Sequence, residues 1–583
     1  MIRDQIKKDF GKVLEKLRIS PEKLVFEHPE NPEFGDYSTN IALKLKVKSQ
    51  KLKVANPFDL ANKIVNTWRS QGLPDWLAKI QVAPPGFINL WLKEDLLIGQ
   101  LSQVLREKDG FGRLAIGKGK TVIVDYSSPN IAKPFGIGHL RSTIIGQALY
   151  NLYKFLGFKV IGDNHLGDWG TQFGKLIYQI KSQKLKVKNL TIEDLERLYV
   201  DFHKKAEENP KLEDEARAWF KKLEEGDKEA RKIWQACVDI SLREFARVYK
   251  LLGIKFDVSY GESFYEGKMA EVVFEAKKKG IAKESQGALI IPIPGMETPL
   301  MLLKSDGATT YETRELATIK YRKKRWHPVL AIWEVGADQK FHFLKSFAAA
   351  ELLGYGKMQQ FVHVPHGLIR WVYGKFSTRK GETIHLEEVL SEAIKRAEKI
   401  ISESETSRGL SKKEKKEVAE AVGVGAVVYF DLSHQPETDI IFDWEKIFVL
   451  EGNSGPYLQY TYARCQSVLA KAKLKQFSNL AIEQSSNLNP EELSILRTIY
   501  KFPEVVQSSA EAFSPNLLCN FLFDLCQKYN LFYQKHPILK PQKRGNLAET
   551  QKIRELRLGL TAATGQVLQN GLTLLGIKTL ERM

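Results

Sequence analysis

The sequence predicts an α/β protein: a doubly wound, Rossmann-like parallel sheet in the middle of the chain, an α+β domain before it and an all-α bundle after it. Residues 121–161 read as strand, glycine-bearing loop, helix and strand, which is half of a doubly wound fold. Beyond residue 384 the apolar side chains follow helical spacing. At 583 residues the chain has room for about three domains.

These patterns divide the chain into four segments. They are an N-terminal domain at 1–112, a central domain at 113–383 with a helical insertion at about 185–275, linker helices at 384–455 and a helical C-terminal domain at 456–583. Within the insertion, residues 185–255 are charge-laced and helical, and no chemistry is visible there.

The N-terminal segment opens with an amphipathic helix, and a second helix is expected at 55–70. Strands are expected near 80–82 and 87–92, and alternation in the second strand places Phe87, Asn89 and Trp91 on one face. An aromatic ring beside an amide can stack on an unpaired base and read its edge. The alternative is that Phe87 and Trp91 face the core.

The central segment begins with a β-branched run at 121–124, the mark of a buried strand. A turn-rich loop with Gly136 and Gly138 follows, and a helix is expected from His139. The N-terminus of that helix offers unpaired N–H groups to an anion, and His139 can donate to a phosphate oxygen. The alternative is a tight turn that ends in a polar histidine.

Further along, a helix starting near Thr310 would place Tyr311 and Glu315 four residues apart on one face. A buried carboxylate beside an aromatic ring suits a guanidinium, because the plane stacks on the ring and its N–H groups bond the oxygens. The alternative is a solvated glutamate beside a packed tyrosine. A strand is expected at 287–293, upstream of this helix, and another at 329–335, after it.

One more strand is expected at 361–370, with His366 and Gly367 inside it. A basic, glycine-bounded loop, 374–381, comes next and contains Lys375. Such a loop can close over a triphosphate and neutralise the departing pyrophosphate. The alternative is a solvated basic turn.

Composition adds broad limits. The net charge of +18 suits a polyanionic partner such as RNA, although a generally basic and soluble protein would look the same. The four cysteines lie far apart, which argues against a disulfide framework and against structural zinc. No apolar run is long enough to span a bilayer, and the N-terminus is no signal peptide. We therefore expect a cytoplasmic protein without a membrane partner.

Several motifs resemble those of one family in order along the chain. They are SSPNIAKPFGIGHLRST at 127–143, NHLGDWGTQF at 164–173, YETRE at 311–315, GADQ at 336–339, GKFSTRKG at 374–381 and EGNSGPYLQY at 451–460. They closely resemble the signatures of class I aminoacyl-tRNA synthetases in the form used by arginyl-tRNA synthetases. The resemblance covers nearly the whole chain apart from 185–255.

The resemblance implies functions for individual residues. For ATP it implies Lys133, Gly136, Gly138, His139, His366, Gly367, Lys375, Ser377 and Arg379, with His139 and Lys375 as the catalytic residues. For the arginine substrate it implies Asp125, Ser128, Asn130, His165, Tyr311, Glu315 and Gln339. For His165, bracing the loop is an equal alternative to binding substrate. Phe87 and Asn89 are implied to contact the D-loop at the tRNA corner, and 456–583 to bind the anticodon.

Three positions depart from the family pattern. Gly136 stands where the first signature has its first histidine, Thr378 stands where the second signature has its second lysine, and Glu315 replaces an aspartate. A further, conservative change places Phe376 where that second signature has methionine.

The function that the resemblance implies is a ligase that joins arginine to the 3'-terminal ribose of tRNA(Arg). Its substrates would be L-arginine, tRNA(Arg) and ATP with Mg²⁺, without zinc, and we expect a monomer that needs bound tRNA to activate arginine. Two alternatives stay open on the residues alone. One is another nucleotidyl transferase with the same Gly-His turn, and the other is an inactive RNA-binding relative, suggested by Gly136 and Thr378.

Overall fold

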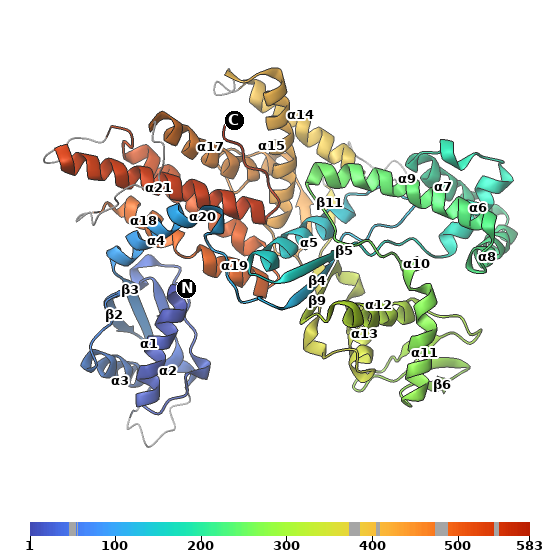
Figure 1. The fold of residues 1–583 in the computed structure, drawn as a ribbon, viewed down its shortest axis with the longest axis horizontal. Helices are drawn as coiled ribbons and strands as arrows, with labels where there is room; N and C mark the ends of the chain where they lie inside the picture. The colour runs from blue at the N-terminus through green and yellow to red at the C-terminus, as the bar shows by residue number, and fades with distance from the viewer. Residues whose placement is uncertain (46–53, 55, 372–384, 404–408, 473–487, 541–546) are drawn as a thin grey trace. The chain divides into compact units, whose positions relative to one another are not determined.

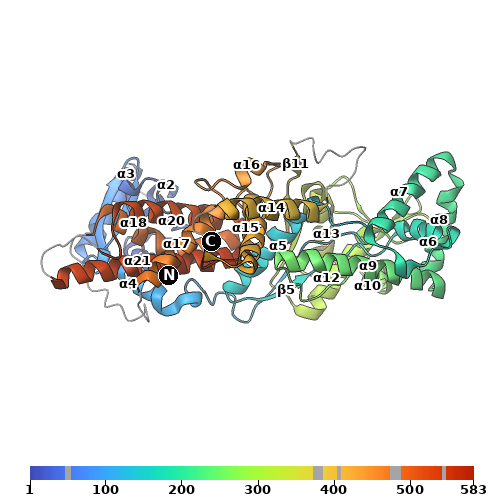
Figure 2. The same ribbon diagram turned by 90° about the horizontal axis from the view of Figure 1, so that it is seen from above.

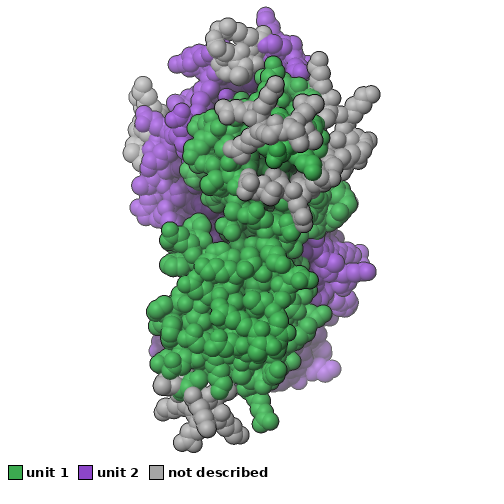
Figure 3. Space-filling model, turned by 90° about the vertical axis from the view of Figure 1, so that its left-hand side faces the viewer, with its two compact units in different colours: residues 1–112, 464–505, 523–570 green, residues 113–463, 506–522, 571–583 purple. Residues whose placement is uncertain are grey.

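The computed structural model describes residues 1–583 except 46–53, 55, 372–384, 404–408, 473–487 and 541–546. The chain forms two compact units (Figure 3). The first contains 1–112, 464–505 and 523–570, and the second contains 113–463, 506–522 and 571–583. Several C-terminal helices contribute residues to both units.

The first unit begins with a small α+β fold, as predicted. Its elements are α1 (Ile2–Lys16), β1 (Tyr37–Thr39), α2 (Ile41–Lys44), α3 (Pro57–Ser70), β2 (Leu77–Ala83), β3 (Phe87–Leu92) and α4 (Glu94–Glu107). The strands form an antiparallel sheet in the order β1-β3-β2. Helix α3 begins at Pro57 because Asn56 caps it: the Asn56 side chain accepts the Asp59 backbone N–H at 2.9 Å.

The C-terminal helices complete both units. They are α17 (Gly455–Ala472), α18 (Pro490–Ile499), α19 (Phe502–Glu511), α20 (Asn516–Lys535) and α21 (Leu547–Leu574). In the ranges described after residue 455, every regular element is helical, so the predicted bundle is confirmed. Cys519 and Cys526 lie buried on α20, and in the structure all four cysteines are buried and outside any disulfide.

The second unit is built on a parallel four-stranded sheet. Its strands are β4 (Thr121–Asp125), β5 (Lys159–Asp163), β9 (Leu330–Gly336) and β10 (Phe361–His366), in the order β10-β9-β4-β5. Helix α5 (Gly138–Phe155) lies on one side of this sheet, and α12 (Tyr311–Trp326) and α13 (Lys340–Leu352) lie on the other (Figure 1). The chain order reverses between β4 and β9, which makes the sheet doubly wound as predicted.

The core of the sheet is apolar on the side of α12 and α13. Buried side chains from the strands and these helices pack together there, including Ile123, Ile161, Leu316, Ala331, Trp333, Phe343 and Phe347. A parallel sheet that is covered by helices on both faces needs apolar side chains along its strands, and these strands supply them.

The insertion after β5 is helical. It comprises α6 (Thr171–Ser182), α7 (Ile192–Glu208), α8 (Lys211–Glu224), α9 (Lys228–Leu252), α10 (Glu262–Tyr265) and α11 (Met269–Lys278). Helices α6 to α9 gather beyond the sheet in both views (Figures 1 and 2). A small antiparallel sheet then forms from β6 (Lys283–Ser285), β7 (Ala288–Ile291) and β8 (Leu300–Leu303). Only β7 of these three strands was expected.

Two expectations near the end of the central segment are corrected. The single strand expected at 361–370 is two strands, because Gly367 separates β10 from β11 (Ile369–Trp371). Strand β11 pairs in parallel with β12 (Ile440–Phe442), so the chain after residue 384 is not entirely helical. The helices between them are α14 (Leu386–Glu403) and α15 (Lys412–Leu432), and α16 (Trp444–Ile447) follows β12. Among the described helices, none has the length and apolar character needed to cross a bilayer.

Helix α5 packs so closely on the residue after β4 that one of its positions, Gly146, has no room for a side chain. A Cβ atom on Gly146 would lie 2.1 Å from the Cβ of Tyr126, which is fully buried beneath the helix. Only a residue without a side chain lets the helix settle on this ring.

We therefore expect Gly146→Ala to destabilise the protein by about 1–3 kcal/mol, because the added methyl forces the packed ring to move. The matched control is Gly99→Ala on α4, where nothing lies within 4 Å of the added carbon. That exposed helical site should gain slightly from the higher helix propensity of alanine. Apparent melting temperatures measure both, and equal temperatures for the two variants would contradict the packing argument.

Candidate functional site

The carboxyl ends of the four parallel strands meet at one edge of the sheet. Strand β4 ends at Asp125, β5 at Asp163, β9 at Gly336 and β10 at His366. Because chain order reverses between β4 and β9, the connections leaving these two strands run to opposite faces, and in open α/β sheets a ligand crevice is expected at such a point. The predicted substrate residues come from this edge and from the helices beside it.

A buried ion-pair cluster occupies the ends of β4 and β5. The guanidinium of Arg322, on α12, donates from Nη2 to Asp125 Oδ2 at 2.6 Å and to Asp163 Oδ2 at 2.9 Å. All three residues are at most 3% exposed. Burial and the neighbouring Asp125 raise the pKa of Asp163, whereas Arg322 opposes that rise.

Glu315 lies beside this cluster and is half-buried. It lies on α12 seven residues before Arg322, and its Oε1 atom is buried. Burial raises the pKa of Glu315 to about 7; Arg322 lowers it and Asp125 raises it further. Glu315 Oε1 and the indole nitrogen of Trp333 are both buried, and a hydrogen bond from that indole also lowers the pKa of Glu315. A carboxylate keeps further acceptor positions that a donor on a ligand can occupy.

Tyr311 and Gln339 lie at the rim of the crevice. Tyr311 is the first residue of α12, as expected, because Thr310 caps the helix with a reciprocal side-chain bond to Thr313. Its ring is 61% exposed and packs against His342 at a centroid distance of 4.9 Å. Gln339 follows β9 and is half-buried, with its amide donating to Asp338 at 3.2 Å. Glu315 is thus half-buried, while the tyrosine ring is open to solvent.

The loop after β4 is held in a strained conformation. Ser127, Ser128 and Ala132 have φ angles of 72°, 45° and 64°, which non-glycine residues rarely adopt. Hydrogen bonds fix each of them: the backbone N–H groups donate respectively to Ser142 Oγ, Asn164 Oδ1 and Ser241 Oγ. Strain of this kind persists only where surrounding contacts over-determine the backbone, and it concentrates at ligand sites.

This loop and the next one bind each other. The Ile131 N–H donates to the Gly167 carbonyl at 3.1 Å, and the Gly167 N–H donates to the Pro129 carbonyl at 3.1 Å. Ser128 Oγ donates to Asp125 Oδ1 at 3.0 Å, and Asn130 is exposed.

Two other candidates from these loops lie at different depths. His165 lies within electrostatic reach of Asp125 and Arg322, and burial lowers the pKa of His165 to about 4, so its ring is neutral at pH 7. Lys133 is exposed, with Nζ over the ring of Tyr199 at 5.1 Å.

The start of α5 carries His139 beside Gly136 and Gly138. Burial lowers the pKa of His139, so the ring is neutral near pH 7, and its Nδ1 has no hydrogen-bond partner within the described part of the chain. One expectation is corrected here. The N–H groups of His139 and Leu140 donate to the carbonyls of Gly136 and Ile137 at 3.0 Å each, because the chain enters the helix through a tight turn. These two N–H groups are therefore not unpaired.

His366 and Gly367 lie across the edge from His139. His366 Nδ1 is 3.0 Å from Glu334 Oε1; burial alone would lower the pKa of His366, but the Glu334 carboxylate raises it above the usual value. Gly367 packs so closely that an added Cβ would meet the Thr438 carbonyl carbon at 2.6 Å. The carbonyl of Gly367 accepts from buried Arg141 of α5 at 3.0 Å, which ties the helix to this strand end.

Five candidate residues lie elsewhere. Lys375, Ser377 and Arg379 fall outside the described residues. Phe87 and Asn89 are on β3 of the first unit. Phe87 is 37% exposed, whereas Asn89 is 4% exposed and its Oδ1 accepts the Ser38 hydroxyl at 2.7 Å. Of the two, only Phe87 presents substantial surface.

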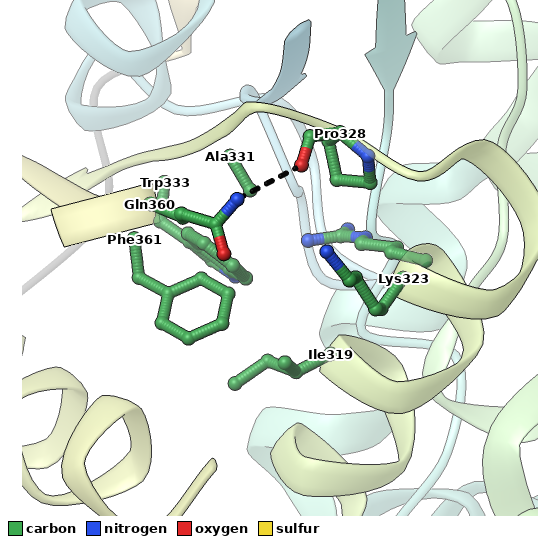
Figure 4. Close-up of a pocket in the computed structure, with 8 residues that line it drawn as sticks. Ile319, Lys323, Pro328, Ala331, Trp333, Gln360 and Phe361 are labelled. Atoms are coloured by element: carbon green, nitrogen blue, oxygen red, sulfur yellow. Dashed lines mark hydrogen bonds between the residues drawn. The ribbon is translucent and has the colours of Figure 1, made fainter. Parts of the chain in front are cut away.

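A small cavity near Trp333 is not the substrate site. It is lined by Ile319, Arg322, Lys323, Pro328, Ala331, Trp333, Gln360 and Phe361 (Figure 4). Its volume of about 10 Å³ is near that needed for one water molecule. Pro328 and Gln360 mark the amino ends of β9 and β10, opposite the edge described above, and the Gln360 amide donates to the Pro328 carbonyl at 3.4 Å (Figure 4).

Sequence reasoning missed Arg322, Asp163 and Glu334. Arg322 repeats the face of Glu315 after seven residues, and Asp163 follows the β-branched pair of its strand after one glycine, Gly162. Those two signals could have identified them. Glu334 sits inside an apolar strand, where a lone carboxylate needs a partner, and His366 provides it. In the described ranges, no group of three or more His, Cys, Asp and Glu side chains is arranged to hold a metal ion.

Three protein-family models match the chain. They are the arginyl-tRNA synthetase N-terminal domain at 4–92, the class I tRNA synthetase (R) catalytic domain at 100–444 and the DALR anticodon-binding domain at 458–583. The catalytic-domain model alone spans more than half of the sequence.

Individual proteins similar to this chain point to the same family as the family models do. The arginine–tRNA ligase of Clostridioides difficile is 41% identical over 96% of this chain and 95% of its own length. That of Fusobacterium nucleatum is 42% identical over 95% and 94%.

Among solved structures, the arginyl-tRNA synthetase of Plasmodium falciparum has a TM-score of 0.84 and 25% identity over 100% of this chain and 99% of its own. The arginyl-tRNA synthetase of Thermus thermophilus shares the fold, with a TM-score of 0.81 and 23% identity over 100% of both chains. The chain therefore belongs to the arginyl-tRNA synthetases, the class I ligases that activate arginine with ATP and transfer it to tRNA(Arg).

Proposed function

We propose that the crevice at the carboxyl ends of β4 and β9 holds arginine and ATP side by side for adenylate formation. The observation that carries the proposal is the convergence of Asp125 and Glu315 on one buried cluster, a short distance along the sheet edge from His139 and His366. A basic substrate side chain needs carboxylates that water does not screen. A triphosphate needs hydrogen-bond donors, and the imidazole ring of His139 at the start of α5 can supply one.

For arginine, we assign Asp125 and Glu315 to the guanidinium, which can bond a carboxylate through two N–H groups. The position of Glu315 beside Asp125 and Arg322, with acceptor capacity left on its carboxylate, supports this assignment. Tyr311 at the rim would cover the guanidinium from the solvent side. Ser128, Asn130, His165 and Gln339 would surround the α-amino and carboxylate groups; Asn130 would orient the amino group.

For ATP, we assign His139 to the α-phosphate and His366 with Gly367 to the adenosine end. A neutral His139 donates one ring hydrogen bond without carrying a charge. Gly136, Gly138 and Lys133 would line the phosphate path. Lys375 would neutralise the leaving pyrophosphate, with Ser377 and Arg379 beside it in the same loop.

The first chemical step needs no side-chain nucleophile. A carboxylate oxygen of arginine attacks the α-phosphorus, the bond to the bridging oxygen breaks, and that oxygen leaves on pyrophosphate with the electron pair. Catalysis is then positioning together with stabilisation of charge at the phosphorus. Mg²⁺ would enter on the phosphate oxygens of ATP, as is usual for that ion, and it would neutralise phosphate charge there.

In the second step, a hydroxyl of the 3'-terminal ribose attacks the adenylate carbonyl, and AMP leaves. We assign residues 1–112 to the tRNA corner, with exposed Phe87 stacking on a D-loop base. Asn89 would support Phe87 from below. Residues 456–583 would bind the anticodon, and the net charge of +18 favours a polyanionic partner. We further propose a cytoplasmic monomer in which bound tRNA is required before arginine is activated.

The test is ATP–pyrophosphate exchange with each of the twenty amino acids, with and without tRNA(Arg). We expect exchange that requires both arginine and tRNA(Arg). Exchange with another amino acid, or none under any condition while tRNA still binds, would contradict the proposal.

The function of His139 can be tested separately. We expect His139→Ala to lower the rate of adenylate formation by about 10²-fold, because one donor to the developing charge is lost. The KM for arginine should change little. ATP–pyrophosphate exchange measures the rate of adenylate formation. His139→Asn, which keeps an N–H donor, should recover part of that rate. An unchanged rate in His139→Ala would remove this residue from the mechanism.

The ionisation of Glu315 predicts a pH dependence. Its pKa is raised to about 7 by burial, so in the empty pocket the carboxyl is protonated below that pH and charged above it. Asp125, Arg322 and Glu262 are the charged groups that act on it. Because the guanidinium binds the charged form, the KM for arginine should rise by up to about tenfold per pH unit as pH falls below 7.

The matched variant is Glu315→Gln, which keeps the shape and cannot ionise. We expect a high KM for arginine that no longer depends on pH near 7, with the KM for ATP close to that of the unmodified enzyme. Steady-state aminoacylation between pH 5.5 and 8.5 measures both constants. A variant that loses ATP affinity instead would show that the pocket is assigned wrongly.

A further inference from the structure

We propose that Arg322 is a positioning residue of the arginine pocket: its guanidinium holds the Asp125 carboxylate in the orientation that receives the guanidinium of the substrate. This inference rests on the proposed function, because it takes Asp125 to be one of the two substrate acids. Arg322 itself would not touch the reacting atoms.

The first support is that one nitrogen connects two strand ends. Asp125 and Asp163 are paired residues on parallel neighbours β4 and β5, and both accept from Arg322 Nη2. The arginine is 1% exposed, and its guanidinium carbon lies 5.3 Å from the ring centroid of Trp333 on β9. Contacts from three adjacent strands therefore fix the position of this guanidinium.

The second support is the geometry of the Asp125 carboxylate. Oδ2 accepts from Arg322 at 2.6 Å, and Oδ1 accepts from the Ser128 hydroxyl at 3.0 Å. Holding both oxygens fixes the side-chain rotation. Each carboxylate oxygen can accept two hydrogen bonds, so each keeps one acceptor position for a ligand. The carboxylate is thus oriented in advance, which lowers the entropy that binding must overcome.

The third support is the count of charges in the cluster. Asp125, Asp163 and Glu315 surround one guanidinium, so an excess of negative charge stays available for a basic substrate. Nε and Nη1 of Arg322 are buried and have no hydrogen-bond partner within the described ranges. These N–H groups can only donate, and a substrate guanidinium also only donates, so it would bond the carboxylates of the cluster and not Arg322. Arg322 also lines the small cavity near Trp333, which has room for about one water molecule.

A purely structural ion pair is the competing explanation, and one double variant separates the two. Arg322→Met together with Asp163→Asn removes one cation and one anion, so the charge of the cluster and the approximate shape are kept. What is lost is the donor that orients Asp125. We expect this variant to melt close to the unmodified protein and to raise the KM for arginine by about tenfold or more, with kcat and the KM for ATP within about threefold.

A conservative variant supplies a second measurement. Arg322→Lys keeps the positive charge but loses the planar guanidinium, so its KM for arginine should lie between those of the unmodified enzyme and the double variant. If the double variant does not fold, Arg322→Lys alone decides the question, through a raised KM for arginine with kcat kept.

The matched control lies on the same helix. Glu312 of α12 pairs with Lys345 of α13 at 2.5 Å, and both are buried. Glu312→Gln with Lys345→Met removes an ion pair of similar burial, keeps an amide oxygen that can accept the Met301 N–H, and should leave the KM for arginine within about twofold.

A KM for arginine equal to that of the unmodified enzyme, in the double variant or in Arg322→Lys, would overturn the inference. So would an equal rise in the control variant. Glu315→Gln in the same assay distinguishes this failure from that of the proposed function. If Glu315→Gln raises the KM and the Arg322 variants do not, only the positioning by Arg322 is wrong. If neither raises it, the pocket itself is wrong.

Discussion

The parallel pairing of β4 with β5 on one side and β9 on the other is the constraint on which the site depends. Parallel strands finish at the same edge, so Asp125 and Asp163 meet without any contribution from the loops. The reversal of chain order between β4 and β9 sends α5 and α13 to opposite faces, and the crevice between them follows from topology alone. Specific chemistry then needs only a few side chains placed along that edge.

The site contains features that are unfavourable in isolation: positive φ angles in the loop after β4 and carboxylates buried together. The loop at 127–132 has three non-glycine residues with positive φ, and the cluster beside it buries two carboxylates, Asp125 and Asp163, against one arginine, with half-buried Glu315 next to them. Each feature costs free energy, and the hydrogen bonds from α5, α9 and the second loop offset only part of it. The Asp125 carboxylate is already oriented by Arg322 and Ser128, so it is prepared for a ligand that donates hydrogen bonds.

The sequence predicts the parts of this site that depend on local spacing. β4 and α5 follow from a β-branched run and from helical periodicity, and a helix start was considered near Thr310; all three agree with the structure. Strands β6, β8 and β12 were missed because short strands are decided by pairing partners far along the chain. Arg322 was missed for a related reason. It lies in a run of basic residues that resembles a solvated helix end, and only the sheet beneath it makes that position buried.

Helix α12 carries two of the residues that we assign to the arginine pocket. It carries both Glu315, which would receive the substrate, and Arg322, which holds the opposing acid on β4. Its first turn is tied to β8, because Thr310 Oγ1 donates to the Met301 carbonyl and Glu312 accepts the Met301 N–H. The helix is anchored at its start and again at Arg322, two turns beyond Glu315, so it cannot tilt without moving Glu315 relative to Asp125. The backbone therefore sets the distance between these two acids. A rigid, planar guanidinium binds both acids only when this distance matches its own dimensions.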